Sequence, residues 1–406
     1  MSGATITGVG VKCSAGNSPD ELWRSLVSGT PSFSRLERSA LTDAGIDVLA
    51  GEDRAFEAAT YFAPSLIRRF DRLHHLGIAA CRDAMEVAGS DCDPRRLGVV
   101  VGLGFGACQF LQDQLQMMIA KGASRVSPLG APLGMMSSLA ALLANEVGAQ
   151  GPVLTISTAC ASGASAIGEA LMLLRTGRVD RVIAGGADAM LTESAVAFFH
   201  RAEVLSTESA DPQLAARPFD RDRNGFVISE GAAFVVLERE AEATASRRRS
   251  FGVVRGYAST TDAFSLVAPE PGGELASHAI ADALRDAEMS PADVGQINAH
   301  GTGTKLNDEA EGAAILRVFG HDAPPVTAPK GVTGHLLGGS GAVELIASCQ
   351  SACAGLVPPT AGLRNIDPSI NLDIVSRDPR SVTKSTVVSN SFGFGGHNAV
   401  LVVSAQ

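Results

Sequence analysis

Short runs of β-branched and aliphatic residues alternate along the chain with segments that place an apolar residue at every third or fourth position. The first pattern predicts strands and the second predicts helices. The predicted strand segments cover residues 5–11, 95–106 and 180–190, and the predicted helices cover 19–29, 76–89 and 168–177. This alternation predicts a layered α/β fold.

One combination of elements occurs twice. Residues 78–106 and 278–303 each contain a helical segment, a turn with Pro and Asp, a strand and a Gly-rich loop. Self-similarity of this kind indicates an internal duplication. The polar, Arg-rich run at 238–250 lies between two strand patterns, and we place the division there. The predicted halves are residues 1–245 and 246–406.

Two segments without charged residues, 126–145 and 147–168, are long enough to raise the question of membrane insertion. Both contain Pro and Gly, and the second is also rich in Ser and Thr, which is poor material for a lipid-exposed helix. The N-terminus lacks a basic segment followed by an apolar one, so no signal peptide is predicted. We expect buried segments of a cytoplasmic protein without a membrane partner.

Composition narrows the class of function. Lys and Arg total 33 and Asp and Glu total 43 among the 406 residues, which gives a formal net charge of −10. With one Trp and two Tyr as well, the chain is poorly suited to bind nucleic acid. The seven cysteines form no metal-type pair, and their odd number argues against a disulfide framework. We therefore expect a reducing compartment and no metal.

Cys160 lies in the segment 153–174, where a β-rich run ends at Ala159 and an Ala-rich helix opens at Ser162. A cysteine at a helix N-terminus lies beside unpaired backbone N–H groups, which favour the thiolate over the thiol. This strand, turn and helix resembles a nucleophile elbow. Taken alone, the segment is equally compatible with a small buried cysteine.

Three further segments are rich in glycine, and two of them contain a histidine that could take part in catalysis. His300 ends a strand pattern before a Gly-Thr loop, and His335 lies in a Gly-rich segment between Lys330 and Glu344. The fourth segment, 387–403, is a predicted Gly-rich hairpin. No G-x-G-x-x-G sequence stands between a strand and a helix, which argues against a dinucleotide loop. One thiol and two imidazoles on separate loops suit nucleophilic catalysis.

These motifs together resemble the β-ketoacyl-[acyl carrier protein] synthases, in particular the synthase II type of fatty-acid and type II polyketide systems. The resemblance runs through ITGVG, TACASG, ARPFDRDRNGFVISEGAA, NAHGTGT, PKGVTGHLLGGSGAVE and NSFGFGGHN. It implies a thiolase-like fold of two duplicated halves in an α-β-α-β-α arrangement. The first half would carry the nucleophilic cysteine and the second the two catalytic histidines.

The resemblance also implies the reaction. Cys160 would accept an acyl group from an acyl carrier protein, and malonyl carrier protein would then lose CO₂ and attack the thioester. His300 and His335 would stabilise the enolate, and the backbone N–H groups of Cys160 and Phe394 would form an oxyanion hole. Phe394 would also act as a gate over the thiol. The product would be a 3-oxoacyl carrier protein, and no cofactor is implied.

Other roles follow from the same resemblance. Lys330 and Glu344 would support the hydrogen-bond network, although an ordinary buried ion pair is the alternative. The expected positions for the other roles are Thr302 and Thr304 for the pantetheine arm, Leu111 and Phe199 for the acyl tunnel, and Arg68, Arg69 and Arg125 for carrier docking. Arg72 adds to this basic group.

Three departures from the family pattern point to a specialised pathway. Glu203 stands where relatives of the synthase II type carry a basic docking residue, Ser265 stands where a His is common, and His397 replaces a Thr. We expect His397 to be structural. We therefore expect the carrier protein to differ from a housekeeping one.

Four functions are compatible with parts of this pattern. An elongating synthase fits the Cys, His, His set, whereas an initiation synthase typically pairs Cys with His and Asn. A thiolase would need a second cysteine near the C-terminal Gly-rich segment, and none follows Cys353. A chain-length-factor-like subunit would lack Cys160. The chain could still pair with such a factor, so both a homodimer and a heterodimer remain open.

Overall fold

Ten strands form the main sheet of the computed structural model, which describes residues 3–406. Five come from the first part of the chain: β1 (Ala4–Cys13), β4 (Leu97–Leu103), β5 (Val153–Ile156), β6 (Arg181–Asp188) and β8 (Gly231–Arg239). Five come from the second: β9 (Val253–Thr261), β10 (Val294–Asn298), β11 (Val326–Thr327), β14 (Thr386–Gly393) and β15 (His397–Ser404). The spatial order is β11, β10, β14, β15, β9, β1, β8, β6, β4, β5.

The two groups of five strands repeat one topology. In the first, β5, β4 and β6 are parallel, and β8 lies antiparallel between β6 and β1. In the second, β11, β10 and β14 are parallel, and β15 lies antiparallel between β14 and β9. The groups meet where the first residues of β1 and β9 pair. This repeat confirms the predicted duplication.

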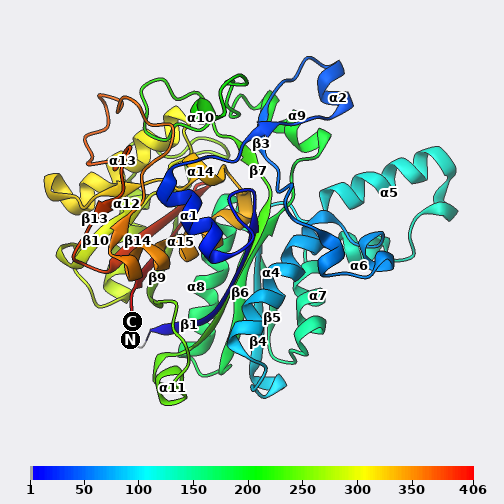
Figure 1. Cartoon of the computed structure of the whole chain (residues 1–406), viewed down its shortest axis with the longest axis horizontal. Coiled ribbons are helices and arrows are strands. Elements are labelled where there is room, and N and C mark those ends of the chain that lie inside the picture. The colour runs from blue at the N-terminus through cyan, green and yellow to red at the C-terminus, as the bar shows by residue number, and fades with distance from the viewer. Residues whose placement is uncertain (1–2) are drawn as a thin grey trace.

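Helices cover and separate the two five-stranded groups, giving five layers (Figure 1). The middle layer is α8 (Ser162–Arg175) with α15 (Ser340–Ala354), and both helices contact strands of both groups. The outer layers are α4 (Arg72–Ala88) with α7 (Ser138–Val147), and α12 (Glu274–Asp286) with α13 (Lys305–Phe319). This is the predicted α-β-α-β-α arrangement.

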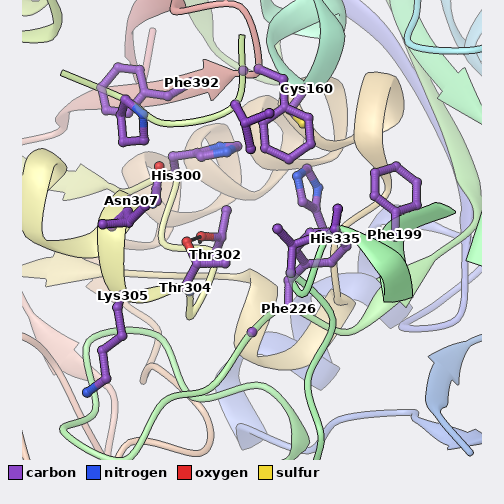
Figure 2. Close-up of a pocket in the computed structure, with 18 of the residues that line it drawn as sticks. Cys160, Phe199, Phe226, His300, Thr302, Thr304, Lys305, Asn307, His335 and Phe392 are labelled. Atoms are coloured by element: carbon purple, nitrogen blue, oxygen red, sulfur yellow. Dashed lines mark hydrogen bonds between the residues drawn. The ribbon is translucent and has the colours of Figure 1, made fainter. Parts of the chain in front are cut away.

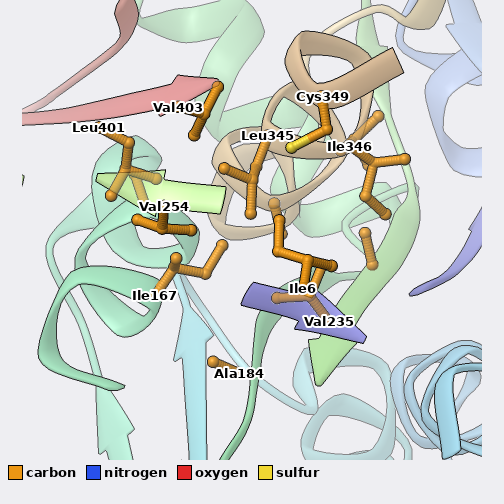
Figure 3. Packing of buried hydrophobic residues seen from close by; sticks show 14 of the residues in the cluster. Ile6, Ile167, Ala184, Val235, Val254, Leu345, Ile346, Cys349, Leu401 and Val403 are labelled. Carbon is orange, nitrogen blue, oxygen red and sulfur yellow. The ribbon is translucent and has the colours of Figure 1, made fainter. Parts of the chain in front are cut away.

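The central core explains why the middle helices are rich in small residues. Ile6, Ile167, Leu345 and Leu401 belong to one buried cluster that joins both five-stranded groups through these helices (Figure 3). A Cβ at Gly163 would lie 2.7 Å from the Gly338 carbonyl oxygen. Such a separation is sterically forbidden, so the helix requires glycine to approach the neighbouring loop.

Smaller elements surround the layers. The short helices are α1 (Pro19–Ser28), α2 (Ser39–Asp43), α3 (Pro64–Ile67), α9 (Glu193–Arg201), α10 (Pro212–Ala215), α11 (Glu240–Ala245) and α14 (Lys330–Thr333). The short strands are β2 (Ser34–Arg35), β3 (Leu49–Gly51), β7 (Ile228–Ser229), β12 (Leu356–Val357) and β13 (Arg380–Ser381). Helix α11 and the loop after it connect β8 to β9, and the predicted division between residues 245 and 246 lies in this connection.

The two charge-free segments form ordinary parts of this fold. The first contributes α6 (Gly130–Gly134) and most of α7, and the second contributes β5 and the start of α8. Together with α5 (Cys108–Lys121), α6 projects from one side of the body (Figure 1). Over the described residues, 3–406, every helix is too short or too polar to cross a membrane.

Candidate active site

Cys160 lies at the turn between β5 and α8, as the sequence predicts. Ala159 adopts a left-handed backbone conformation with φ of 50°, which is strained for a residue with a side chain. The Ser162 hydroxyl accepts a hydrogen bond from the Thr158 N–H at 2.9 Å and lies 2.6 Å from the Ala159 carbonyl oxygen. These contacts fix the sharp turn that directs the cysteine side chain into a cavity.

The cavity brings the sulfur and both histidines together (Figure 2). It has a volume of about 360 Å³. Its aromatic lining consists of Phe199, Phe226, Phe392 and Phe394. Its polar lining includes Thr302, Thr304, Asn224, Asn307, Asp262, Asn398, Glu203 and Lys305. The cavity therefore suits a long, mainly apolar ligand with a polar portion.

His300 follows β10 and is held by two charged groups. The Lys330 ammonium lies 3.0 Å from the imidazole Nδ1 and donates to the His300 carbonyl oxygen at 2.6 Å. An ammonium group can only donate hydrogen bonds. Nδ1 therefore accepts a hydrogen bond from Lys330, and Nε2 carries the ring hydrogen. The Glu311 carboxylate accepts the backbone N–H groups of His300 and Gly301, both at 2.8 Å.

His335 reaches the cavity from the turn after α14. Its backbone N–H donates to the Val227 carbonyl at 2.7 Å. Its Nδ1 accepts the Leu337 N–H at 3.2 Å and lies 3.0 Å from the Ser340 hydroxyl. Nδ1 is thus an acceptor here too, and Nε2 carries the hydrogen.

Both imidazoles are neutral. Burial lowers the pKa of His300 well below its ordinary value, and the charge of Lys330 lowers it further. Burial and the Lys330 ammonium lower the pKa of His335 in the same way. The ring centroids lie 5.4 Å apart. The site therefore presents two adjacent N–H donors on uncharged rings.

Lys330 and Glu344 form a buried ion pair, with Nζ and Oε1 separated by 2.5 Å. Burial raises the pKa of Glu344 to about 7, although the neighbouring ammonium lowers it. Lys330 thus contacts both His300 and Glu344, and neither side chain of the pair lines the cavity. The geometry suits the supporting role expected from the resemblance.

The thiol differs from the sequence expectation in its protonation state. Burial raises the pKa of Cys160 to about 11. The Lys330 charge and hydrogen bonds from the backbone N–H groups of Phe394 and Cys160 lower it, but by less. The resting sulfur is therefore a thiol, because loss of solvent outweighs the effect of the helix N-terminus. The same two N–H groups are those expected to form an oxyanion hole.

The Gly-rich segment after β14 places Phe394 at the sulfur. Gly395 and Gly396 have φ of 83° and 75°, so the turn uses a conformation that glycine adopts readily. The Gly395 N–H donates to the Leu266 carbonyl at 2.9 Å, and the Asp262 N–H donates to the Gly396 carbonyl at 2.9 Å. Two loops are thus joined beside Phe394.

The remaining expected site residues fall into three groups. Thr302 and Thr304 line the cavity with their hydroxyl oxygens 2.9 Å apart. Phe199 also lines it, in edge contact with Phe226 at 5.7 Å between ring centroids. Leu111 does not line the cavity: it lies on the projecting helix α5, 47% exposed, where it packs on Gly134.

Three of the four arginines grouped as a basic surface are exposed, namely Arg68, Arg69 and Arg125. Arg72 is different. Its guanidinium donates to Glu230 at 2.8 Å and to the Asp53 carbonyl at 2.6 Å. The expectation for Arg72 was wrong, because this side chain is half-buried and neutralises an acid from a distant segment.

Sequence reasoning missed three buried polar residues that shape the site. Glu311 holds the His300 loop, as described above. Asp188, at the end of β6, accepts the N–H groups of Gly104 at 2.9 Å and Gly338 at 2.8 Å. Asn398 lines the cavity and donates to Asp262 at 2.6 Å. A carboxylate at the end of a buried strand was the available signal for Asp188.

Comparison with known proteins identifies the protein family of this chain. Residues 3–243 match the model of the β-ketoacyl synthase N-terminal domain, and residues 251–364 match that of the C-terminal domain. The chain therefore belongs to the β-ketoacyl synthase family.

Individual relatives are similar over their whole length. The chain is 38% identical over 401 residues to 3-oxoacyl-[acyl-carrier-protein] synthase 2 of Synechocystis, covering 98% of this chain and 96% of the relative. It is 36% identical over 402 residues to the protein of the same name in Staphylococcus aureus, covering 98% and 97%.

Solved structures give the same result for the fold. The ishigamide ketosynthase/chain length factor superposes with a TM-score of 0.92 at 31% identity, covering 100% of this chain and 99% of the other. A β-ketoacyl synthase from Burkholderia phymatum superposes with a TM-score of 0.92 at 28% identity, covering 100% of both chains.

Proposed function

We propose that this chain catalyses the decarboxylative Claisen condensation of a Cys160-bound acyl group with malonyl-[acyl carrier protein], in fatty-acid or type II polyketide elongation. The observation that carries the proposal is the meeting of the Cys160 thiol with the Nε2–H donors of His300 and His335 in one largely apolar cavity. A condensing enzyme needs these parts together: a nucleophile, donors for an enolate and a dry space for an acyl chain.

In the first half-reaction, the Cys160 sulfur attacks the thioester of an acyl carrier protein. The bond between the acyl carbon and the carrier sulfur breaks, and the thiol proton leaves with the carrier thiol. The backbone N–H groups of Cys160 and Phe394 donate to the sulfur in the resting site. In the tetrahedral intermediate they donate to the oxyanion and stabilise it. The N-terminus of α8 lies beside the Cys160 sulfur and favours the thiolate that forms during this attack.

In the second half-reaction, the malonyl thioester loses CO₂ and leaves an enolate. Its thioester oxygen gains negative charge and accepts hydrogen bonds from Nε2 of His300 and His335. Each such donor typically stabilises a transition state by about 2.7 to 4 kcal/mol. The enolate carbon attacks the acyl-Cys160 carbonyl, the sulfur departs and takes up a proton, and a 3-oxoacyl carrier protein results.

Other residues of the cavity bind the two ends of the substrate. Thr302 and Thr304 hydrogen-bond the pantetheine arm, and Phe199 contacts the acyl tail. Phe394 moves with its loop to admit the acyl group. Lys330 and Glu344 hold the tautomer of His300. Arg68, Arg69 and Arg125 are exposed cations that an acidic carrier protein could contact.

The enzyme acts as a dimer in the cytoplasm. Strand β5 is an edge of the sheet and exposes Val153 and Leu154, and such an edge is normally covered. The projecting helix α5 exposes Leu111, Leu115 and Ile119. We assign these surfaces, Leu111 included, to a subunit interface that closes the far end of the acyl tunnel.

A heterodimeric polyketide ketosynthase is the second candidate. Solved structures similar to this chain include a ketosynthase with its chain length factor from Xenorhabdus doucetiae, with a TM-score of 0.87 and 29% identity. Another is a type II polyketide ketosynthase in complex with its acyl carrier protein, with a TM-score of 0.92 and 29% identity. In that case a synthase-like chain would cover β5 and α5.

Intact-mass analysis after exposure to acyl carrier proteins, and then to malonyl carrier protein, tests the proposal. We expect acyl mass on the wild type, none at this position in Cys160→Ala, and transfer of the acyl mass into a 3-oxoacyl carrier protein. Unchanged condensation by Cys160→Ala would refute the proposal. Loading only after addition of a synthase-like partner would establish the heterodimer.

A further inference from the structure

Arg223 is a charged side chain that the reaction described above does not use. Its side chain is completely buried, and it is among the largest fully buried side chains of the described residues. A buried guanidinium is retained only if its N–H groups are bonded and its charge is neutralised. Its partners therefore show which segments it holds together.

The guanidinium joins three segments that are distant in sequence. Nη1 donates to the Asp220 carbonyl at 2.9 Å and to the Asp367 carboxylate at 2.5 Å. Nη2 donates to the Lys305 carbonyl at 3.1 Å and to Glu309 at 3.2 Å. Nε donates to the Thr304 carbonyl at 3.3 Å. Two of these acceptors are backbone carbonyls where the loop with the two cavity-lining threonines meets α13, at Thr304 and at Lys305.

The same loop is also held by a counter-ion of Arg223, Asp308. Asp308 lies 3.4 Å from Nε and is completely buried. Its carboxylate accepts the N–H of Gly303 at 3.2 Å and that of Phe219 at 2.7 Å. The Gly225 N–H, two residues after Arg223, donates to the Gly303 carbonyl at 3.0 Å.

The backbone around this cluster is strained where it meets the site. Phe219 has φ of 65°, a costly conformation for a bulky residue that persists only when its surroundings enforce it. A Cβ at Gly301 would lie 3.3 Å from the Phe219 ring, so this ring packs directly against the residue after His300. The ion pair of Arg223 and Asp308 thus supports one wall of the cavity.

We propose that Arg223 is a positioning residue for the arm of carrier-bound substrates. It fixes the 302–305 loop through two carbonyls and through Asp308, and it does not line the cavity. This inference rests on the proposed function only in naming the arm as the ligand of that loop. Lysine could keep the charge at this position, but it could not make five directed hydrogen bonds from a planar fork.

The test compares Arg223→Lys with wild type on two substrates. For malonyl carrier protein we expect KM to rise about tenfold with kcat within about threefold, since the defect is in positioning the arm. For an octanoyl-N-acetylcysteamine thioester, which lacks the outer part of the arm, we expect the acylation rate of Cys160 to be unchanged. Equal losses on both substrates, or no change in KM, would overturn the inference.

A matched control separates positioning from simple loss of stability. Arg175 is a largely buried arginine, with a side chain 8% exposed, that pairs with Asp286 at 2.7 Å and lies in the middle layer. Arg175→Lys should lower the melting temperature without raising the KM for malonyl carrier protein. If Arg223→Lys does not fold, Asp367→Asn removes one partner of the guanidinium and should give a smaller rise in the same KM.

Carrier binding provides a readout that does not depend on turnover. The Kd of a holo acyl carrier protein, measured by fluorescence anisotropy, should rise for Arg223→Lys and stay unchanged for Arg175→Lys. If the wild type makes no 3-oxoacyl product, only the proposed function is refuted. The Kd comparison then still tests the role of Arg223. An unchanged Kd for Arg223→Lys would contradict that role.

Discussion

The Lys330 ammonium lies 3.0 Å from Nδ1 of His300 and 2.5 Å from Oε1 of Glu344. One cation therefore fixes the tautomer of an imidazole and neutralises a buried carboxylate. Because the ammonium can only donate, His300 must present its hydrogen at Nε2, toward the cavity. The Lys330–Glu344 ion pair and His300, the expected enolate donor, therefore form one connected network.

Replacing Lys330 with Met should remove this control. We expect decarboxylation of malonyl carrier protein to slow by about a hundredfold, because Nδ1 can then carry the hydrogen and Nε2 ceases to be a donor. Acyl loading of Cys160 should persist at a reduced rate, because it does not need the imidazole donor but loses the Lys330 charge that lowers the pKa of the thiol. Single-turnover assays of the two half-reactions would check this.

Glu344→Gln is the matched control, because it removes the carboxylate and leaves the contact between Lys330 and His300 in place. Its decarboxylation rate should stay within about tenfold of the wild type. If Lys330→Met lost both half-reactions equally, a general collapse of the pocket would explain the result better than a tautomer change. Circular dichroism would show whether both variants are folded.

Cys160 should react as a buried thiol. Its pKa is raised to about 11 by burial, so the thiolate fraction at neutral pH is small and grows with pH. We expect alkylation of this residue by iodoacetamide to accelerate about tenfold per pH unit between pH 7 and pH 9. Peptide mass mapping would distinguish Cys160 from the exposed Cys353.

A rate that is already constant above pH 7 would contradict this prediction. It would mean that the helix N-terminus and the N–H groups of Phe394 and Cys160 outweigh burial. Ala159→Gly offers a control, since it relieves the left-handed strain of the turn without changing the polarity around the sulfur.

The histidines should show no titration near neutral pH. Burial and Lys330 lower both pKa values well below the ordinary range, so the neutral rings persist as pH falls through 6.5. We expect Cys160→Ala, which lacks the titrating thiol, to retain at least about half its decarboxylation rate between pH 7.5 and pH 6. A loss with a midpoint near 6.5 would show that a protonated imidazole forms and is inactive.

The parts of the site that the sequence predicted are those with local signals. Cys160, His300 and His335 each lie where a strand pattern or a Gly-rich turn ends, so a few neighbouring residues reveal the loop. The duplicated fold was predictable for the same reason, because the repeated pattern of helix, turn and strand is local and strong.

The parts it missed depend on long-range contacts. Glu311 is an ordinary acid in an Ala-rich helix until the fold places the His300 loop over it. Arg223 gains four of its five hydrogen-bond partners from segments more than 80 residues away. Arg72 was misassigned because Glu230, which neutralises it, lies far along the chain. No local pattern distinguishes such residues from exposed charges.

The mouth of the cavity carries an acidic residue. Glu203 lines the cavity and is exposed, directly after α9, with φ of 58°. A negative charge at this position repels an acidic carrier protein as it approaches. Glu203→Lys should therefore lower the KM for a fatty-acid-type carrier about threefold at low ionic strength, and 0.5 M salt should abolish the difference.

Glu86→Lys makes the same change in net charge on the outer face of α4, away from the cavity lining. It should leave the KM unchanged, because the electrostatic effect of an exposed charge is screened over about 10 Å at 0.1 M salt. If the two variants lowered KM equally, total charge and not the position of Glu203 would govern carrier binding. If Glu203→Lys raised KM, the natural carrier would be one that presents a cation to this carboxylate.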